Sequence, residues 1–155
     1  MRAPIIALAL PLLTTVVQAR DGFQWGHGDL GRDRSSIMYA VPESDNIWVS
    51  GSCIRKNVVR VMFSIRPKAV TKVSPDTDNY LATIRVGGEP YRLIGKLEAD
   101  EINDGHVFIA MITPDDRLLQ RMAADSKSSF RYDNATIPLD MKSASGFKGM
   151  LKVCT

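Results

Sequence analysis

Apolar side chains recur at every second position along residues 59–65 and again along residues 80–86, and Arg60, Ser64, Thr83 and Arg85 lie between them. Successive side chains of a β-strand point to opposite faces of its sheet, so this period predicts two strands that each bury one face. Gly87 and Gly88 follow the second segment directly, and glycine adopts the positive φ angles of a tight turn without steric conflict. We therefore expect residues 89–97 to return as the hairpin partner, within an antiparallel sheet.

Other segments extend this prediction along the chain. Runs of β-branched, aromatic or alternating residues, bounded by turn residues, predict further strands at 36–41, 47–54, 128–132 and 136–139. Residues 107–112 are apolar at odd and even positions alike. Such a strand is expected in the middle of a sheet rather than at its edge.

A helix is predicted directly after residues 107–112. Thr113 and Pro114 fit the cap and the first position of a helix, and Asp115 and Asp116 place negative charge near the positive end of its dipole. An apolar stripe follows at Leu118, Leu119 and Met122.

The last residues predict a second helix. Its apolar positions fall at i, i+3, i+4 and i+7, which places them on one face. They are Phe147, Met150, Leu151 and Cys154. This face is expected to turn Cys154 toward the core.

Together these segments predict a mainly β fold, an antiparallel sandwich or partial barrel of seven or eight strands with one late helix and a C-terminal helix. No repeat or linker divides residues 36–155, which are expected to form a single domain. Residues 20–35 are rich in glycine and charge and lack a sustained period, so we expect a flexible N-terminal arm there.

Residues 1–19 have the organisation of a secretory signal peptide. Arg2 supplies the positive charge, residues 5–17 an apolar stretch, and residues 17–19 a cleavage site. The stretch is shorter than the roughly 20 apolar residues that span a bilayer, and no later segment comes closer. We expect a soluble protein that begins at Arg20, has no transmembrane segment, and is periplasmic or secreted.

Two cysteines, Cys53 and Cys154, are present. An even number of cysteines in an exported chain favours a disulfide between them. The chain-entropy model gives about 4 to 5 kcal/mol for closing a loop of about 100 residues. A metal site, for which no histidine lies near, and a nucleophilic cysteine are the alternatives.

Composition and motifs favour neither nucleic-acid binding nor catalysis. The chain carries 20 basic and 17 acidic residues, a net charge of +3, which is too balanced for a nucleic-acid partner. Arg55, Arg60, Arg85 and Arg92 are scattered among the predicted strands, as on a solvated sheet face. The sequence lacks the motifs of serine hydrolases, zinc peptidases, phosphate-binding loops and redox dithiols. We expect no enzyme activity, no cofactor and no bound metal.

An acidic run could still support calcium binding or catalysis. Its members are Glu98, Asp100, Glu101 and Asp104. The spacing lacks the alternation and the bidentate end residue of an EF-hand loop, so a solvated loop is favoured over a calcium site. Hydrolysis by Glu98 and Asp100 is the catalytic hypothesis to test.

Two residues of the expected N-terminal arm are candidates for contact with a partner. Trp25 has no evident structural duty there, and exposed tryptophan often anchors binding. His27 is the second candidate; its alternatives are a base, a metal ligand together with Asp29, or an exposed loop histidine. Trp48 alternates with Val49 on a predicted strand and is expected in the core.

A strand cysteine at Cys53 and the closing pattern Ser143, Phe147, Leu151, Cys154 resemble small bacterial periplasmic proteins. The similar families are the type VI secretion-associated VasI-like proteins and, more distantly, the invasion-associated locus B proteins. Their β domain is finished by a helix that ends in a disulfide-bonded cysteine. This chain departs from the locus B type in having only two cysteines. The resemblance implies an accessory or host-interaction role without catalysis, and it transfers no active site.

These observations lead to the hypothesis of an exported, non-catalytic binding protein of the bacterial envelope or exterior. Its partner is expected to be a protein, which the sequence does not identify. An inhibitor or immunity factor for an exported hydrolase or toxin fits a small disulfide-braced sheet, which presents its loops rigidly. The alternative is a structural accessory of an envelope or secretion assembly.

Overall fold

The computed structural model describes most of the chain after its N-terminal segment. The described residues are 22–29, 35–43, 46–66, 79–101, 104–125, 127–141 and 145–155. The expected signal peptide at residues 1–19 lies outside them, as do Arg20 and Ser143.

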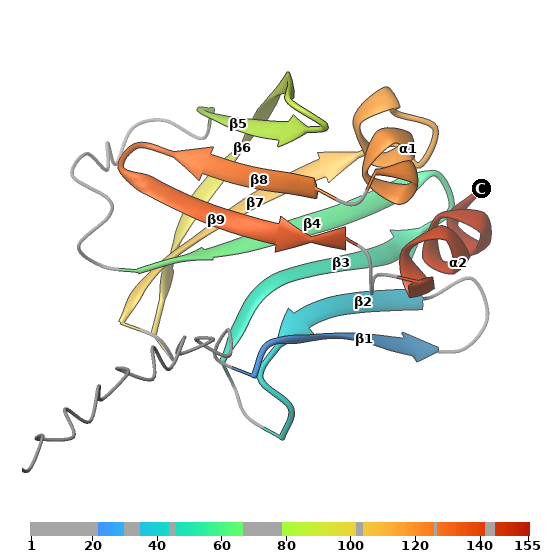
Figure 1. The fold of residues 1–155 in the computed structure, drawn as a ribbon, viewed down its shortest axis with the longest axis horizontal. Helices are drawn as coiled ribbons and strands as arrows, with labels where there is room; N and C mark the ends of the chain where they lie inside the picture. The colour runs from blue at the N-terminus through green and yellow to red at the C-terminus, as the bar shows by residue number, and fades with distance from the viewer. Residues whose placement is uncertain are drawn as a thin grey trace, which may run out of the picture.

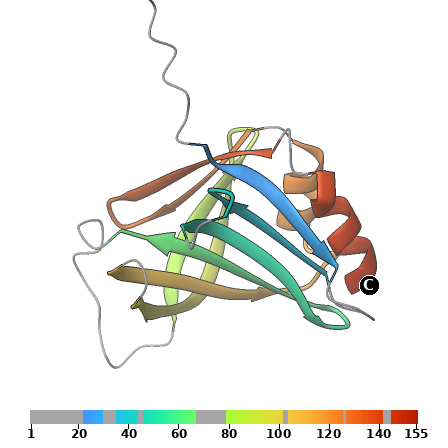
Figure 2. The ribbon, with the colours of Figure 1, turned by 90° about the horizontal axis from the view of Figure 1, so that it is seen from below.

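Nine antiparallel strands form one curled sheet, a half-barrel, in the order β1-β2-β3-β4-β7-β6-β5-β8-β9 (Figures 1 and 2). The strands are β1 (Gln24–Asp29), β2 (Ser35–Ala40), β3 (Ile47–Arg55), β4 (Val58–Ile65), β5 (Tyr80–Val86), β6 (Glu89–Asp100), β7 (Gly105–Ile112), β8 (Lys127–Tyr132) and β9 (Ala135–Asp140). The predicted fold class is therefore confirmed: the chain is mainly β, with one late helix and one at the C-terminal end.

The predicted hairpin between β5 and β6 is confirmed. Val86 pairs with Glu89, and the two residues between them, Gly87 and Gly88, have φ angles of 58° and 88°. A two-residue turn with positive φ at both positions matches the twist of the strands that it joins.

Gly95 is the point at which the curled sheet changes direction. β6 pairs with β5 as far as Gly95, which faces Tyr80, and with β7 from Lys96 onward. A Cβ atom at Gly95 would collide with the backbone oxygen of Ile109 and would lie 2.8 Å from the ring of Phe108. One strand thereby serves both halves of the curled sheet, because glycine permits the close approach at the bend.

β7 occupies the central position that its apolar sequence predicts, between β4 and β6. Its inward side chains Phe108, Ala110 and Ile112 are buried. The outward Met111, by contrast, is 57% exposed, so no element of the described residues covers that face at Met111.

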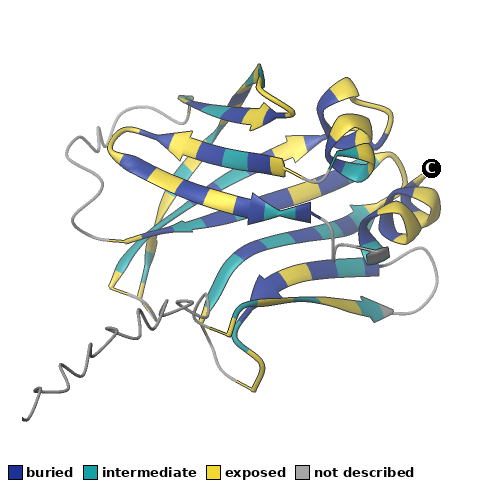
Figure 3. Cartoon of the chain, in the orientation of Figure 1, coloured by how far each residue is buried: buried dark blue, intermediate teal, exposed yellow. Residues whose placement is uncertain are grey.

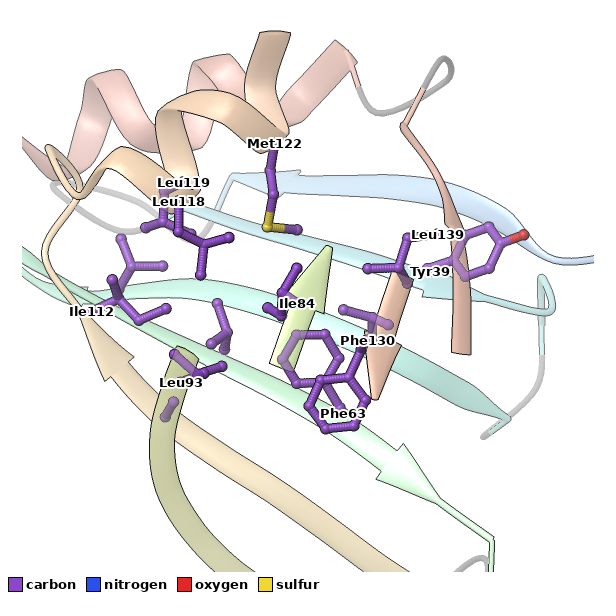
Figure 4. Close-up of a cluster of buried hydrophobic side chains, with 14 of the residues drawn as sticks. Tyr39, Phe63, Ile84, Leu93, Ile112, Leu118, Leu119, Met122, Phe130 and Leu139 are labelled. Carbon is purple, nitrogen blue, oxygen red and sulfur yellow. The ribbon is translucent and has the colours of Figure 1, made fainter. Parts of the chain in front are cut away.

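The core lies inside the curl, where aromatic rings from both halves meet (Figure 4). Phe63 of β4 stacks on Phe130 of β8 with ring centroids 4.0 Å apart, and Phe108 of β7 lies 5.5 Å from Phe130. Burying a phenylalanine side chain stabilises a fold by roughly 1.5 to 3 kcal/mol, and a ring pair adds about 0.5 to 1.5 kcal/mol. These contacts join strands that are distant in the sheet order.

The first helix, α1 (Arg117–Ala124), begins later than predicted. Asp116 is the cap: its Oδ1 accepts a hydrogen bond of 2.8 Å from the backbone N–H of Leu118. Thr113 instead starts a turn, in which its carbonyl oxygen accepts from the N–H of Asp116 at 3.0 Å. The apolar stripe is confirmed, since Leu118, Leu119 and Met122 are buried.

The second helix, α2 (Ser145–Cys154), buries the apolar face that its spacing predicts. Phe147, Met150, Leu151 and Cys154 are all buried. The disulfide between Cys53 and Cys154 is also confirmed, with their Cα atoms 5.4 Å apart. It fixes the end of α2 to β3, and α2 lies beside α1 at one end of the half-barrel (Figure 1).

A ninth strand, β1, lies within residues 20–35, where a loop-like arm was expected. It pairs with β2 along its whole length, from Gln24 opposite Ala40 to Asp29 opposite Ser35. A period of two is present there, but small and polar residues hide it: Trp25 and His27 lie opposite the buried Tyr39 and Ile37, while glycines occupy the other face. The expectation of a loop was wrong for Gln24–Asp29, because pairing with β2 outweighs the poor strand propensity of glycine.

Candidate functional site

Trp25, a candidate for partner contact, helps to close the curled sheet. Its Nε1 donates a hydrogen bond of 2.6 Å to the backbone oxygen of Asp140, at the end of β9. Its ring packs on Tyr39 of β2 with centroids 5.1 Å apart. β1 and β9 are the two edges of the sheet, so Trp25 links edges that no strand pairing joins. Trp25 therefore has a structural role that the sequence did not reveal. Its contact with a partner stays a prediction.

His27, the second candidate, lies where β1 meets α2. We call the region in which β1 meets β9 and α2 the seam. Its Nε2 lies 2.9 Å from the Oγ of Ser35, which is the spacing of a base and a hydroxyl nucleophile. Ser35 is only 2% exposed, so a substrate has little access to this hydroxyl. Gly146 of α2 lies so close that a Cβ atom there would be 2.7 Å from the Cβ of His27. These contacts favour a role in positioning β1 against α2.

The acidic residues of β6 do not gather into a recognisable catalytic or metal centre. Glu98 is exposed, and the Oγ of Ser64 donates to Oδ2 of Asp100 at 3.4 Å. Within the part of the chain that the structure describes, no three histidine, cysteine, aspartate or glutamate side chains are placed to hold a metal ion.

A cluster of arginines lies on the outer side of β5, β6 and β8. Thr83 of β5 pairs with Arg92 of β6 on one side and with Arg131 of β8 on the other, so the three residues form one row across three strands. Arg85 follows two residues along β5, on the same face. Inward and outward residues alternate along these strands (Figure 3). We call this surface the arginine face and define it as Leu81, Thr83, Arg85, Arg92, Ile94, Ser129 and Arg131.

The arginines of this face differ in their partners from those of α1. Arg117 pairs with Glu89 at 3.0 Å and Arg121 with Asp125 at 3.7 Å. Arg92 and Arg131 form no ion pair or hydrogen bond with any residue that the structure describes. Arg85 donates from Nη1 to the backbone oxygen of Gly88 at 3.2 Å and forms no ion pair with a described carboxylate.

Two large apolar side chains border the row of arginines. Leu81 and Ile94 face each other across β5 and β6, and they are 56% and 63% exposed. Single exposed apolar residues are common on protein surfaces, but adjacent ones mark candidate interfaces. Arginine is also enriched at interfaces between proteins.

A hollow of about 410 Å³ lies on this surface. Its lining includes two of the arginines and several hydroxyl groups: Leu81, Thr83, Arg85, Ser129, Arg131, Tyr132, Asp133 and Thr136. Burial raises the pKa of the Tyr132 phenol, and the nearby Tyr80 and Asp133 add to the shift, so this phenol is protonated at neutral pH. The hollow therefore offers guanidinium and hydroxyl donors, beside the carboxylate of Asp133, to a ligand that carries oxygen acceptors.

Two further hollows are smaller and have fewer arginines. One of about 340 Å³ separates α1 from α2, with Gln120, Lys148 and Lys152 in its lining. Another, of about 190 Å³, lies beside Trp48. Trp48 was expected in the core; it is partly buried, packs on Phe23 with ring centroids 4.7 Å apart, and has the Arg66 guanidinium 5.3 Å from its ring centre.

No protein-family model, curated protein or solved structure matches this chain. No helix of the described ranges has the length and apolar character needed to cross a membrane.

The arginine face is the feature that sequence reasoning missed. The hairpin at Gly87 and Gly88 was predicted, and counting back from it along both strands places Thr83 opposite Arg92. The neighbourhood of Thr83 and Arg131 depends on the pairing of β5 with β8, which are separated in sequence by two strands and α1. No local pattern in the sequence indicates that pairing. The arginines therefore looked scattered among separate predicted strands.

Proposed function

We propose that this protein is an exported, non-catalytic binding protein that holds a protein partner on the arginine face. The observation that carries the proposal is the pair of exposed apolar side chains, Leu81 and Ile94, directly beside exposed arginines on neighbouring strands. Buried apolar and arginine side chains supply much of the energy of protein interfaces, because they combine apolar contact with directed hydrogen bonds.

The surroundings of the polar residues support binding rather than catalysis. The described pair His27 and Ser35 has catalytic spacing, but its hydroxyl is buried and the His27 side chain packs against Gly146 of α2. The outward groups of the arginine face are guanidinium, hydroxyl and aliphatic side chains, which suit recognition. None of these groups is an ordinary general base at neutral pH.

Export is proposed from two features that agree. Residues 1–19 have the organisation of a signal peptide, and the Cys53–Cys154 disulfide is of the kind that persists in oxidising compartments. We place the protein in the periplasm or outside the cell. An inhibitor or immunity factor for an exported hydrolase or toxin suits this scaffold, since a stapled sheet loses little conformational freedom when it binds.

Affinity capture with matched variants tests the proposal. Immobilised oxidised protein is exposed to envelope and secreted proteins. The proteins that it retains are compared with those retained by the double variant Leu81→Ser/Ile94→Ser. Met38→Ser is the control, because Met38 is 37% exposed on β2, which β3, β4 and β7 separate from β6 in the strand order. We expect a partner that the original protein and the control retain and that the double variant loses.

Equal retention by all three proteins would contradict a binding role for the arginine face. Failure of the original protein to retain any partner at micromolar concentration would contradict the binding function itself. The identity of a retained partner would separate an inhibitor from an accessory of an assembly.

A further inference from the structure

We infer that the partner of the arginine face is an acidic protein segment whose carboxylates lie on Arg92 and Arg131 around Thr83. The inference rests on the proposed binding function and adds the chemistry of the partner. Three steps carry it: the spacing of the arginines, their lack of carboxylate partners, and the character of the groups between them.

The register sets the spacing of the charges. Neighbouring strands lie about 4.8 Å apart, so the backbones of Arg92 and Arg131 are roughly 10 Å apart across Thr83. Arg85 lies two residues from Thr83 along β5, or roughly 7 Å. Three guanidinium groups therefore emerge within the footprint of one short segment of a partner.

Arg92 and Arg131 form no ion pair with a described carboxylate, although Asp133 lies in the lining of the same hollow as Arg85 and Arg131. Arg117 and Arg121 show that this chain does provide carboxylates to arginines elsewhere, with pairs at 3.0 and 3.7 Å. Guanidinium groups bind carboxylates through two parallel hydrogen bonds, and such charge-assisted bonds are stronger than neutral ones. A partner carboxylate would supply the acceptor that the chain itself does not provide at Arg92 and Arg131.

The groups between and beside the arginines specify the partner further. The hydroxyls of Thr83, Ser129 and Thr136 lie in the lining of the hollow of about 410 Å³ and can donate to carboxylate oxygens. Leu81 and Ile94 then offer apolar contact to the residues that flank the carboxylates. A protein segment combines acidic and apolar side chains in this way, whereas nucleic acid binds chiefly through charge that the whole chain, at +3, supplies weakly.

Titration of the isotope-labelled, oxidised protein with two synthetic peptides tests the inference by NMR. One peptide alternates glutamate and leucine, and the other carries glutamine in place of every glutamate. We expect shifts of the backbone amides of Thr83, Arg92 and Arg131 with the glutamate peptide. The affinity for the glutamine peptide should be lower by about tenfold or more, as the loss of a charge-assisted contact predicts.

Two variants of equal charge complete the test. Arg92→Gln/Arg131→Gln should weaken binding of the glutamate peptide by about tenfold, whereas Lys148→Gln/Lys152→Gln, on the exposed side of α2, should leave it unchanged. Equal affinity for both peptides, or equal loss in both variants, would overturn the inference. Tighter binding of a heparin tetrasaccharide or of phosphatidylglycerol vesicles than of the glutamate peptide would also overturn it, in favour of a different polyanion.

This outcome is separable from failure of the proposed function. A captured partner that Leu81→Ser/Ile94→Ser loses, but that Arg92→Gln/Arg131→Gln retains, would leave the binding role intact and refute the acidic partner. A partner that both variants retain would instead refute the arginine face as the binding surface.

Discussion

The seam where β1 meets β9 and α2 differs from the arginine face in how its polar groups are used. In the seam, Trp25 donates to Asp140 and His27 lies within hydrogen-bond distance of Ser35, so groups that suit binding are engaged within the fold. On the arginine face, Arg92 and Arg131 point outward without a described acidic partner. The comparison teaches that residue type alone does not identify a site: tryptophan and histidine drew attention in the sequence, while the outward arginines offer the more accessible chemistry.

Removal of the disulfide is expected to have the largest effect on stability, because the disulfide fixes α2, which packs against β1 in the seam. Replacement of both cysteines, Cys53→Ser/Cys154→Ser, should lower the free energy of unfolding by about 2 to 5 kcal/mol, since the unfolded chain regains the freedom of a long loop. Denaturant unfolding measures the change, with the reduced original protein as control. A loss below about 1 kcal/mol would mean that packing alone holds α2 in place.

Two glycines of α2 sharpen the same comparison. Gly146→Ala should destabilise the protein by about 1 to 3 kcal/mol, because its Cβ would lie 2.7 Å from the Cβ of His27 and β1 and α2 would have to separate. Gly149→Ala is the matched control: nothing lies within 4 Å of its Cβ, so the better helix propensity of alanine should raise stability by up to about 1 kcal/mol. Thermal unfolding of both variants measures the difference. Shifts of the same sign and size would refute close packing at Gly146.

Loss of a single hydrogen bond should have a smaller effect. Trp25→Phe keeps an aromatic ring beside Tyr39 but removes the Nε1 donor that reaches the oxygen of Asp140. We expect a loss of about 1 kcal/mol, the usual net worth of such a bond. Hydrogen exchange of the β1 amides should increase in parallel, because β1 would lose its link to β9. Unchanged stability and unchanged exchange would show that the seam does not depend on Trp25.

The seam and the arginine face also differ in how much of their structure can be predicted from the sequence. The strands from 36 onward, the hairpin at Gly87 and Gly88, and the apolar face of α2 follow from local periods, because the pattern of burial is set within each element. β1 does not follow from its own sequence, since its glycines give it a weak period and β2 supplies the pairing. The row at Thr83 depends on the β5–β8 pairing, which is a property of topology rather than of any one segment.

The smallest expected effect is the change in the free energy of unfolding when arginines of the arginine face are replaced. Arg92→Gln/Arg131→Gln should change the free energy of unfolding by no more than about 0.5 kcal/mol, because neither side chain has a described partner to lose. Arg117→Gln is the comparison: it removes the 3.0 Å pair with Glu89 and should cost up to about 1 kcal/mol, the usual limit for an exposed ion pair.

Chemical denaturation of these variants at low and moderate salt measures both effects, since screening weakens the pair at Arg117 and any repulsion among the face arginines. A loss above about 1 kcal/mol in the double variant would place Arg92 and Arg131 among the residues that hold the fold together, like Trp25 in the seam. Unchanged stability, combined with lost binding of the glutamate peptide, would separate the two regions: the seam serves the fold, and the arginine face serves the partner.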